Sequence, residues 1–296
     1  MILFISFLII LAMLSTKISD KFGLPLLIGF ILIGVLVGSD VLNLFYFDNA
    51  LLTKKIADIL LIFIIFDGGF HITKDTFHKV AGPSMTLALL GVALTSVTLG
   101  FLIHFVLKFD LAYSMLISSI ISSTDAAGVF MITKSNPIKD KLAATLNVES
   151  AANDPMAILL TLTFVHIATG AFDTPALTVA RLIWQFVGGI IIGYFAFQIS
   201  VWLFNRLQSD NRGNYNVLML GCVLLGYGAA EFFQANGIIA VFFMGYWIGN
   251  TAFPAKRSVG SFLESVSTIF NITLFIMLGL LSFPHRFVHI WKEALI

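Results

Sequence analysis

Charged residues are scarce in this chain. Asp, Glu, Lys and Arg make up only 11% of its 296 residues, whereas roughly a quarter of the residues of a soluble globular domain are charged. Apolar side chains make up 58%, and the mean hydropathy is +0.98. Because so few charged side chains cannot cover a globule of this size, most of the surface must face lipid. The composition excludes an ordinary soluble domain and predicts an integral membrane protein.

Blocks of like charge, paired cysteines and metal-ligand clusters are also missing. The formal net charge is +1, and without a basic or acidic block no nucleic-acid partner is expected. The single cysteine, Cys222, excludes an intrachain disulfide and is interpreted as a small apolar helix residue. His104 and His166 lie near span ends without the spacing of zinc ligands. No resident metal and no cofactor are therefore expected.

The apolar residues gather in ten long stretches. A helix needs about 20 mostly apolar residues to cross about 30 Å of hydrocarbon, and polar, Gly or Pro residues separate stretches near that length. Long unbroken apolar runs favour helices over strands of alternating polarity. The predicted fold class is an all-α polytopic membrane protein, with spans at residues 1–16, 24–40, 56–71, 81–107, 111–132, 142–169, 176–204, 215–233, 237–252 and 261–282.

The distribution of Lys and Arg between alternate loops predicts the orientation. Of the 17 Lys and Arg residues, eleven follow odd-numbered spans and six lie in the remaining loops and tail. The side richer in Lys and Arg normally stays in the cytoplasm. The amino terminus is therefore predicted outside.

Polar residues inside spans mark candidate functional positions, because ionisable groups are expensive at membrane depth. Asp67, before Gly68 and Gly69 at the cytoplasmic end of span 3, is either a pathway carboxylate or an interfacial residue. In span 5, Ser118–Gly128 contains five hydroxyls, Asp125 and a glycine. Such residues compete with helical hydrogen bonding, which predicts a helix that unwinds and offers carbonyls to a cation. A small-residue packing face with one solvated carboxylate is the alternative.

Span 6 carries two carboxylates within the segment Asn147–Pro155. At helical spacing Ser150 and Asp154 stack on one face, and Glu149 and Asn153 stack on the neighbouring face. Pro155 cannot donate to the carbonyl of the residue four positions earlier, which frees an acceptor near Asp154. A purely structural pair of buried acids remains possible.

The chemistry of Asp154 suggests exchange of two ions. Desolvation favours the protonated form of a carboxyl group, so Asp154 could carry either a proton or a cation. Hydroxyl and carbonyl oxygens suit a hard monovalent cation, and Ser150 with Thr124 could supply them. Competition between the two ions for the same oxygens would give obligatory exchange.

Three motifs resemble the cation:proton antiporter-1 family of NhaP-like Na⁺/H⁺ or K⁺/H⁺ antiporters. Glu149–Pro155 matches its Glu-Ser-x-x-Asn-Asp-Pro pattern, Ser123–Ala126 matches its Ser/Thr-Thr-Asp-Ala/Pro element, and Asp67–Gly69 matches its acidic-Gly element. They occur in the family's order, and the resemblance covers the whole chain. These forms resemble the potassium branch more than the sodium branch.

The resemblance implies a role for each matching residue. Asp154 would be the ion- and proton-binding carboxylate, with Ser150, the Thr124 backbone and Asp67 near the ion. Structural or dipole-balancing roles would fall to three further residues, Asp125, Asn153 and Glu149. Asp125 would balance the half-helix dipoles, Asn153 would hold the unwound segment, and Glu149 would pair with an arginine of a later span.

The resemblance also implies the architecture of an inverted-repeat antiporter with a broken helix. Residues 1–170 would form the first repeat, 171–205 a connecting span, and 206–296 a partial second repeat with the start of span 11. No Arg-Gly-Ala or Arg-Gly-Gly motif, which the family carries in that repeat, occurs before Ile296. We therefore expect a fragment that is inactive unless completed. A homodimer in the lipid bilayer of a prokaryotic plasma membrane, without enzymatic activity, is expected.

Three other functions are compatible with acids inside a membrane. An intramembrane aspartyl protease could use Asp67 and Asp154, but its Gly-x-Gly-Asp surroundings are missing. A channel could conduct through a broken helix, yet a titratable acid suits coupled exchange better than a carbonyl filter. A cation-coupled symporter of an organic anion, which can share this fold, is the main alternative and would need dedicated polar groups for its substrate.

Overall fold

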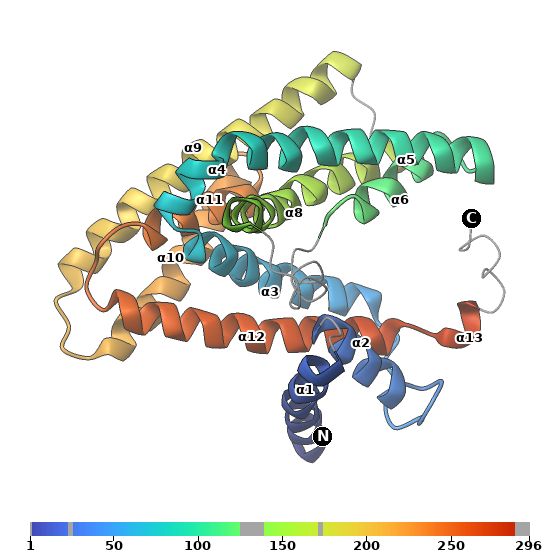
Figure 1. Cartoon of the computed structure of the whole chain (residues 1–296), viewed down its shortest axis with the longest axis horizontal. Helices are drawn as coiled ribbons and strands as arrows, with labels where there is room; N and C mark the ends of the chain where they lie inside the picture. The colour runs from blue at the N-terminus through green and yellow to red at the C-terminus, as the bar shows by residue number, and fades with distance from the viewer. Residues whose placement is uncertain (1, 23–25, 125–138, 171–173, 288–296) are drawn as a thin grey trace. The chain divides into compact units, whose positions relative to one another are not determined.

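The chain is almost entirely helical. The computed structural model describes residues 2–22, 26–124, 139–170 and 174–287, and within these ranges the regular elements are helices without strands (Figure 1). The helices fall into two compact units. The first takes residues 1–64, 127–137 and 265–296, and the second takes residues 65–126 and 138–264. This division concerns compactness rather than internal symmetry, so the predicted repeat boundaries stay a prediction.

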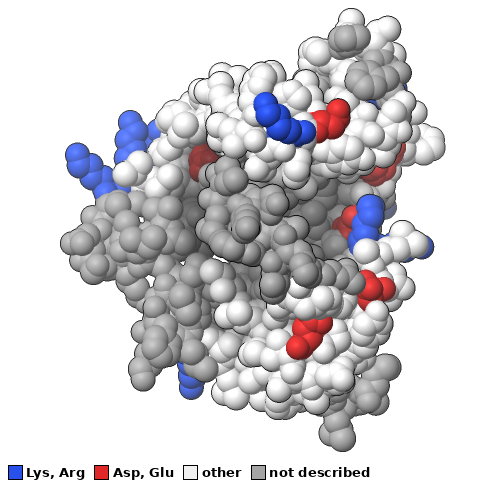
Figure 2. Space-filling view, turned by 90° about the vertical axis from the view of Figure 1, so that its right-hand side faces the viewer, with Lys and Arg blue, Asp and Glu red and all other residues white. Residues whose placement is uncertain are grey.

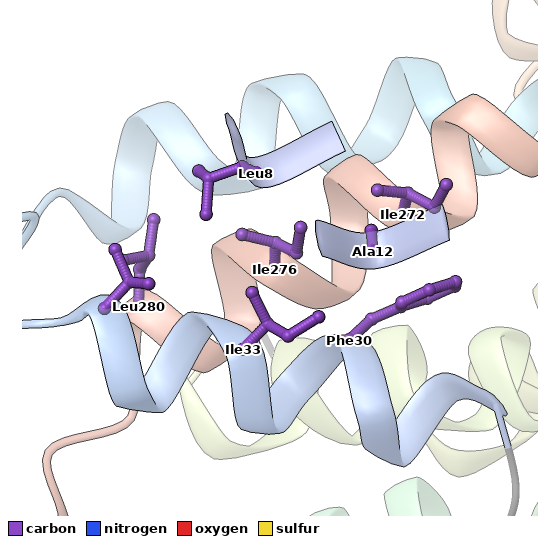
Figure 3. Packing of buried hydrophobic residues seen from close by; sticks show 8 residues of the cluster. Leu8, Ala12, Phe30, Ile33, Ile272, Ile276 and Leu280 are labelled. Atoms are coloured by element: carbon purple, nitrogen blue, oxygen red, sulfur yellow. The ribbon is translucent and has the colours of Figure 1, made fainter. Parts of the chain in front are cut away.

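The first unit contains α1 (Ile2–Phe22), α2 (Leu26–Val37), most of α3 (Ala50–His71) and α12 (Lys256–Leu281), and α13 (Pro284–Phe287). Helices α1, α2 and α12 meet at an apolar core (Figure 3), whose buried residues are Leu8, Ala12, Phe30, Ile33, Val37, Ile272, Ile276 and Leu280. Where α2 crosses α12, a Cβ on Gly34 would lie 2.3 Å from the Ile276 carbonyl oxygen. The crossing therefore requires glycine.

The second unit holds the remaining helices. Helices α4 (Lys74–Thr86), η1 (Leu87–Gly91, a π-helical turn) and α5 (Val92–Leu107) form one continuous rod (Figure 1), and α6 is Leu111–Ile121. Helix α8 (Asp140–Ala168) packs against that rod and against α6. The other three helices pack on one another, and they are α9 (Pro175–Leu207), α10 (Arg212–Phe232) and α11 (Gly237–Gly249).

Polar caps explain several helix boundaries. Thr73 accepts a hydrogen bond from the Thr76 amide, so α4 begins seven residues before the predicted start of span 4, at Lys74 rather than residue 81. Asp110 caps α6 and Asn236 caps α11 in the same way. Such caps satisfy amides that have no partner inside the helix. The helix is therefore longer than the predicted span 81–107, because polarity alone does not reveal a capped helix end, and the start of the span itself stays a prediction.

Five helices are long and apolar enough to cross a membrane, judged by length and composition over the described residues. They are the rod from Lys74 to Leu107, α8, α9 from Ala176, α10 and α12. The other five predicted spans, which correspond to α1, α2, α3, α6 and α11, stay predictions. Large apolar side chains such as Leu90 and Val217 are each 68% exposed, as expected of lipid-facing positions. Figure 2 shows one face on which few of the described side chains are charged.

Predicted spans 5 and 6, which carry most of the candidate site residues, differ: the helix of span 5 stops early, and the helix of span 6 is continuous. Helix α6 ends at Ile121 inside the predicted span 111–132, and residues 122–124 continue without helical structure. Of the hydroxyl-rich segment predicted to unwind, residues 118–121 are still helical, residues 122–124 are non-helical, and the rest lies outside the described residues. Helix α8 instead runs unbroken through Pro155. A continuous helix, α8, therefore lies beside the end of α6, which stops within a predicted span.

Candidate functional site

Thr124 is held against α8 by three side chains. Its backbone carbonyl accepts hydrogen bonds from Ser150 Oγ at 3.0 Å and from Asn153 Nδ2 at 3.2 Å. Its hydroxyl accepts from Asn153 Nδ2 at 2.6 Å and donates to Glu149 Oε1 at 3.1 Å. In a membrane, backbone polar groups beyond a helix end need such partners unless water reaches them. Helix α8 thus satisfies the backbone that the early end of α6 exposes.

Asn153 is the centre of this arrangement. It is fully buried, with 0% of its surface exposed. Besides Thr124, its amide nitrogen lies 2.9 Å from Glu149 Oε1, one helical turn earlier. The hydrogen bonds to Glu149 in the described part of the chain therefore come from neutral donors, the Thr124 hydroxyl and the Asn153 amide. The arginine partner implied for Glu149 stays a prediction.

Asp154 is hydrogen-bonded to Ser123. The Ser123 hydroxyl donates to Asp154 Oδ1 at 2.5 Å, and it also lies 3.1 Å from Asn153 Oδ1. Hydrogen bonds between a hydroxyl and a carboxylate are short and strong. Asp154 and Ser123 are both partly buried. The acidic residue singled out in the sequence therefore lies directly beside the non-helical segment after α6.

Further hydroxyls join the helices around this cluster. Ser84 of α4 donates to the Thr145 carbonyl of α8 at 3.1 Å, and Thr161 of α8 donates to Ser119 of α6 at 3.3 Å. Ser96 of α5 lies 3.5 Å from Ser118 of α6. Small hydroxyl residues of this kind allow close helix packing and hydrogen bonds between helices in membranes. They fix the position of α6 relative to α8.

Asp67 does not share a hydrogen bond with this cluster among the described residues. On α3, its Oδ1 lies 3.1 Å from His71 Nδ1, which also lies 3.0 Å from the Asp67 carbonyl oxygen. The side chain is 15% exposed, and among the described residues Oδ1 accepts no hydrogen bond of good geometry. Within that part of the chain, no hydrogen bond joins Asp67 to Asp154.

The structure brings together most of the residues predicted from the sequence. Five of them form one hydrogen-bonded cluster, which consists of Thr124, Glu149, Ser150, Asn153 and Asp154. Asp125 lies outside the described residues, and Asp67 contacts His71 instead. Sequence reasoning gave no role to Ser123, although it belongs to the hydroxyl run of span 5. The sequence feature that could have identified Ser123 as a site residue is its position directly before Thr124.

Comparison with known proteins identifies the family. The family described as "Sodium/hydrogen exchanger, transmembrane" matches residues 5–296. The chain belongs to the sodium/hydrogen exchanger family. The similarity found in the motifs of spans 3, 5 and 6 therefore extends over nearly the whole chain, and the NhaP-like assignment is confirmed.

Curated relatives are bacterial and archaeal antiporters. The K(+)/H(+) antiporter NhaP of Alkalimonas amylolytica is 34% identical over 96% of this chain and 50% of its own length. The K(+)/H(+) antiporter NhaP2 of Shewanella sp. (strain ANA-3) is 29% identical with the same coverage. The chain thus spans about half the length of these relatives. The Probable Na(+)/H(+) antiporter 2 of Methanocaldococcus jannaschii is 26% identical over 94% of this chain and 69% of its own length.

A solved structure shares the fold. The sodium proton antiporter MjNhaP1 from Methanocaldococcus jannaschii superposes with a TM-score of 0.78 over 95% of this chain and 70% of that one. Sequence identity is 21%, so the likeness concerns the fold. It confirms the predicted fold class, an all-helical membrane protein of the NhaP-like antiporter fold.

Proposed function

We propose that this chain carries the ion-binding site of a monovalent cation/proton antiporter, in which Asp154 binds either an alkali cation or a proton. One observation carries the proposal. Residues 122–124, directly after α6, are non-helical and are hydrogen-bonded to Asp154, Ser150 and Asn153 of a continuous helix long enough to span a membrane. A broken helix beside a buried acid is the arrangement with which many secondary transporters bind ions. The family membership and the names of the relatives support the same reading.

The hydrogen bonds around Thr124 suggest how a cation would bind. The Thr124 carbonyl accepts from both Ser150 and Asn153, so its two lone pairs are occupied. If the Ser150 hydroxyl turns away, its own oxygen and the Thr124 carbonyl both become available. Together with Asp154 they offer three oxygens to a hard cation, which suits an alkali ion. One lost hydrogen bond is exchanged for several ion–oxygen contacts.

Competition at Asp154 couples the two ions. A cation and a proton cannot occupy the same carboxylate oxygens, so each pH unit below the midpoint lowers the apparent cation affinity about tenfold, or about 1.4 kcal/mol. Loading on one side of the membrane and release on the other then gives exchange. Asp67 would lie on the ion path, and Asp125 would balance the half-helix dipoles. Because the bacterial relatives with the higher identity are named K⁺/H⁺ antiporters, K⁺ is the proposed cation.

The proposal includes the setting of the protein. We place it in the plasma membrane of a prokaryote, with the amino terminus outside and as a homodimer. Residues 1–170 form the first inverted repeat, residues 171–205 connect, and residues 206–296 belong to the second repeat. No enzymatic step is involved.

Everted membrane vesicles test the proposal. The protein, as its gene encodes it, is expressed in cells that lack their own antiporters, and the vesicle interior is acidified by respiration. Addition of K⁺ or Na⁺ should dissipate the pH gradient in the wild type. Asp154→Asn should abolish this response, because the amide cannot take up a proton at these pH values. Asp140→Asn, on the same helix but exposed in its first turn, is the matched control and should retain exchange.

The outcomes separate the competing functions. Exchange retained in Asp154→Asn would overturn the role of this carboxylate. Cation current without coupled proton movement would indicate a channel. Cation-dependent uptake of an organic anion would indicate a symporter. A pocket of about 300 Å³ between η1, α5, α8 and α9, among the described residues, is lined by apolar side chains such as Leu89, Met156 and Phe186, so an organic anion is not expected to bind in that pocket.

A further inference from the structure

Ser123 differs from the serines that precede it. The hydroxyls of Ser118, Ser119 and Ser122 donate to backbone carbonyls three residues earlier, at 2.9, 2.8 and 2.7 Å. Such bonds satisfy a hydroxyl within its own segment. Ser123 is beyond the end of α6, and its hydroxyl points across to α8. It is the first residue of the run whose side chain is directed at the candidate ion site.

The Ser123 hydroxyl has one hydrogen and two acceptors. Asp154 Oδ1 lies at 2.5 Å and Asn153 Oδ1 at 3.1 Å. A hydroxyl carries one donor and two acceptor lone pairs, and it rotates to suit its partners. It can therefore donate to either oxygen at a given moment. When it donates to Asn153, its lone pairs are free to face Asp154.

A cation shared by the Ser123 hydroxyl and Asp154 Oδ1 requires the second of these positions. Two oxygens that share a cation have no hydrogen between them, so the hydrogen bond from Ser123 to Oδ1 opens when the ion binds between them. Asn153 is already in place to accept the released hydrogen bond, and it is fully buried and held by Thr124 and Glu149. The hydroxyl therefore keeps a hydrogen-bond partner with the site empty and with the site filled.

We propose that Ser123 is a further ligand of the transported cation, one that donates its hydrogen bond to Asp154 in the empty site and to Asn153 in the occupied site. This inference rests on the proposed function. In the empty site Ser123 fixes the rotamer of the carboxylate. In the occupied site it adds a neutral oxygen to those of Asp154, Ser150 and Thr124. Rotation of the Ser123 hydroxyl replaces its hydrogen bond to Asp154 with a contact to the cation, and the backbone does not need to move.

The test is the concentration of cation that gives half-maximal exchange, measured in everted vesicles with Na⁺ and with Rb⁺ as the probe for K⁺. Ser123→Ala removes the ligand and should raise the KM about tenfold, in the range found when groups that support a metal site are lost, while kcat stays within about twofold. Ser123→Thr keeps a hydroxyl at the same place and should restore the KM. Ser123→Cys keeps the volume but offers sulfur, a poor ligand for a hard cation, so its KM should also rise.

Ser122→Ala is the matched control. Ser122 is buried, and its hydroxyl donates only to the Ser119 carbonyl among the described contacts, so its removal should leave the KM unchanged. A KM unaltered in both Ser123→Ala and Ser123→Cys would overturn the inference, as would equal effects at Ser122 and Ser123. Failure of the inference is distinct from failure of the proposed function. In the first case Asp154→Asn still abolishes exchange, and in the second case it does not.

Discussion

At the scale of single residues, Asn153 connects the parts of the candidate site. Its amide nitrogen lies within 3.2 Å of the Thr124 carbonyl, the Thr124 hydroxyl and Glu149 Oε1, and its oxygen faces Ser123. None of its surface is exposed. Because Asn153 is fully buried, its polar atoms would be left unsatisfied without these bonds, and we expect the connected network to contribute more than its separate hydrogen bonds.

Asn153→Ala tests this reading. The substitution removes one of the two donors to the Thr124 carbonyl and one of the donors to Glu149, and it removes the oxygen that Asn153 offers to Ser123. Each such hydrogen bond contributes about 0.5–1.5 kcal/mol. We expect a lower thermal unfolding midpoint of the purified protein in detergent, measured by size-exclusion chromatography after heating. Asn214→Ala removes an exposed amide that donates to Ser209 and should leave the midpoint nearly unchanged. Equal stability of both variants would contradict the role given to Asn153.

The sequence predicted the part of the site that local geometry determines. Glu149, Ser150, Asn153 and Asp154 lie on neighbouring faces of one helix, and helical spacing alone brings them together. The role of Ser123 could not be predicted, because its direction depends on where α6 stops and how the chain continues. The same limit applies to Asp67. Helical spacing places His71 beside it, but the distance from Asp67 to Asp154 depends on how the helices pack and could not be predicted.

At the scale of helices, glycines set how closely α3 and α11 approach. A Cβ on Gly245 would lie 2.4 Å from the Phe66 carbonyl oxygen, and one on Gly249 would lie 2.1 Å from that of Phe70. From the other side, a Cβ on Gly69 would lie 2.2 Å from the Phe242 carbonyl oxygen. Backbone atoms cannot move aside as flexible side chains can. The motif that places Asp67 beside two glycines thus also serves helix packing.

Gly245→Ala should therefore separate the two helices. We expect destabilisation of about 1–3 kcal/mol, as for other overpacked interiors, seen as a lower thermal unfolding midpoint. Gly221→Ala on α10 is the control, since nothing lies within 4 Å of its Cβ position, and it should be neutral or slightly stabilising. A Gly245→Ala protein as stable as the control would show that the crossing is not this close.

The segment between α2 and α3 is tied to α13 by a pH-dependent contact. His285 approaches Asp40 Oδ2 with its Nδ1 at 2.5 Å and its backbone amide at 3.1 Å. Desolvation raises the pKa of Asp40, but the hydrogen bonds and the charge of His285 outweigh this effect and hold the pKa below its ordinary value. Because the pKa of Asp40 is lower in the folded state, the contact stabilises the fold at pH values above the ordinary pKa of a carboxyl group. That stabilisation is lost as pH falls through the lowered value.

Hydrogen exchange measures this contact. We expect the His285 amide to be protected at neutral pH and to lose that protection on acidification below about pH 4, where carboxyl groups take up protons. Asp40→Ala should remove the protection at every pH. A His285 amide whose protection is the same with and without the Asp40 carboxylate would refute the contact.

At the scale of the whole molecule, hydropathy predicted the fold class, because helices that span lipid must satisfy their own backbone. The hydroxyl-rich composition of span 5 predicted that its helix unwinds, and α6 ends within that segment, whereas the continuity of α8 through Pro155 was not predicted from the sequence. Boundaries were less predictable, as the start of α4 shows, where a polar cap extends an apolar helix. The orientation remains to be measured.

Single cysteines test the orientation. Cys222 is buried, so the unmodified chain serves as the blank. Val41, 50% exposed between α2 and α3, is predicted outside, and exposed Asp210, between α9 and α10, is predicted inside. An impermeant maleimide should label Val41→Cys in intact cells and Asp210→Cys only after permeabilisation. The reverse pattern would place the amino terminus in the cytoplasm.

The central claim is that one carboxylate, Asp154, holds a proton or an alkali cation but not both. The most direct measurement is proton release from the purified, weakly buffered protein when K⁺ or Na⁺ is added near the midpoint of its pH range. The account predicts that cation binding displaces protons from the wild type, with the same dependence on cation concentration as exchange, and that Asp154→Asn releases none. Cation binding without proton release, or equal release from the Asp154→Asn protein, would contradict it.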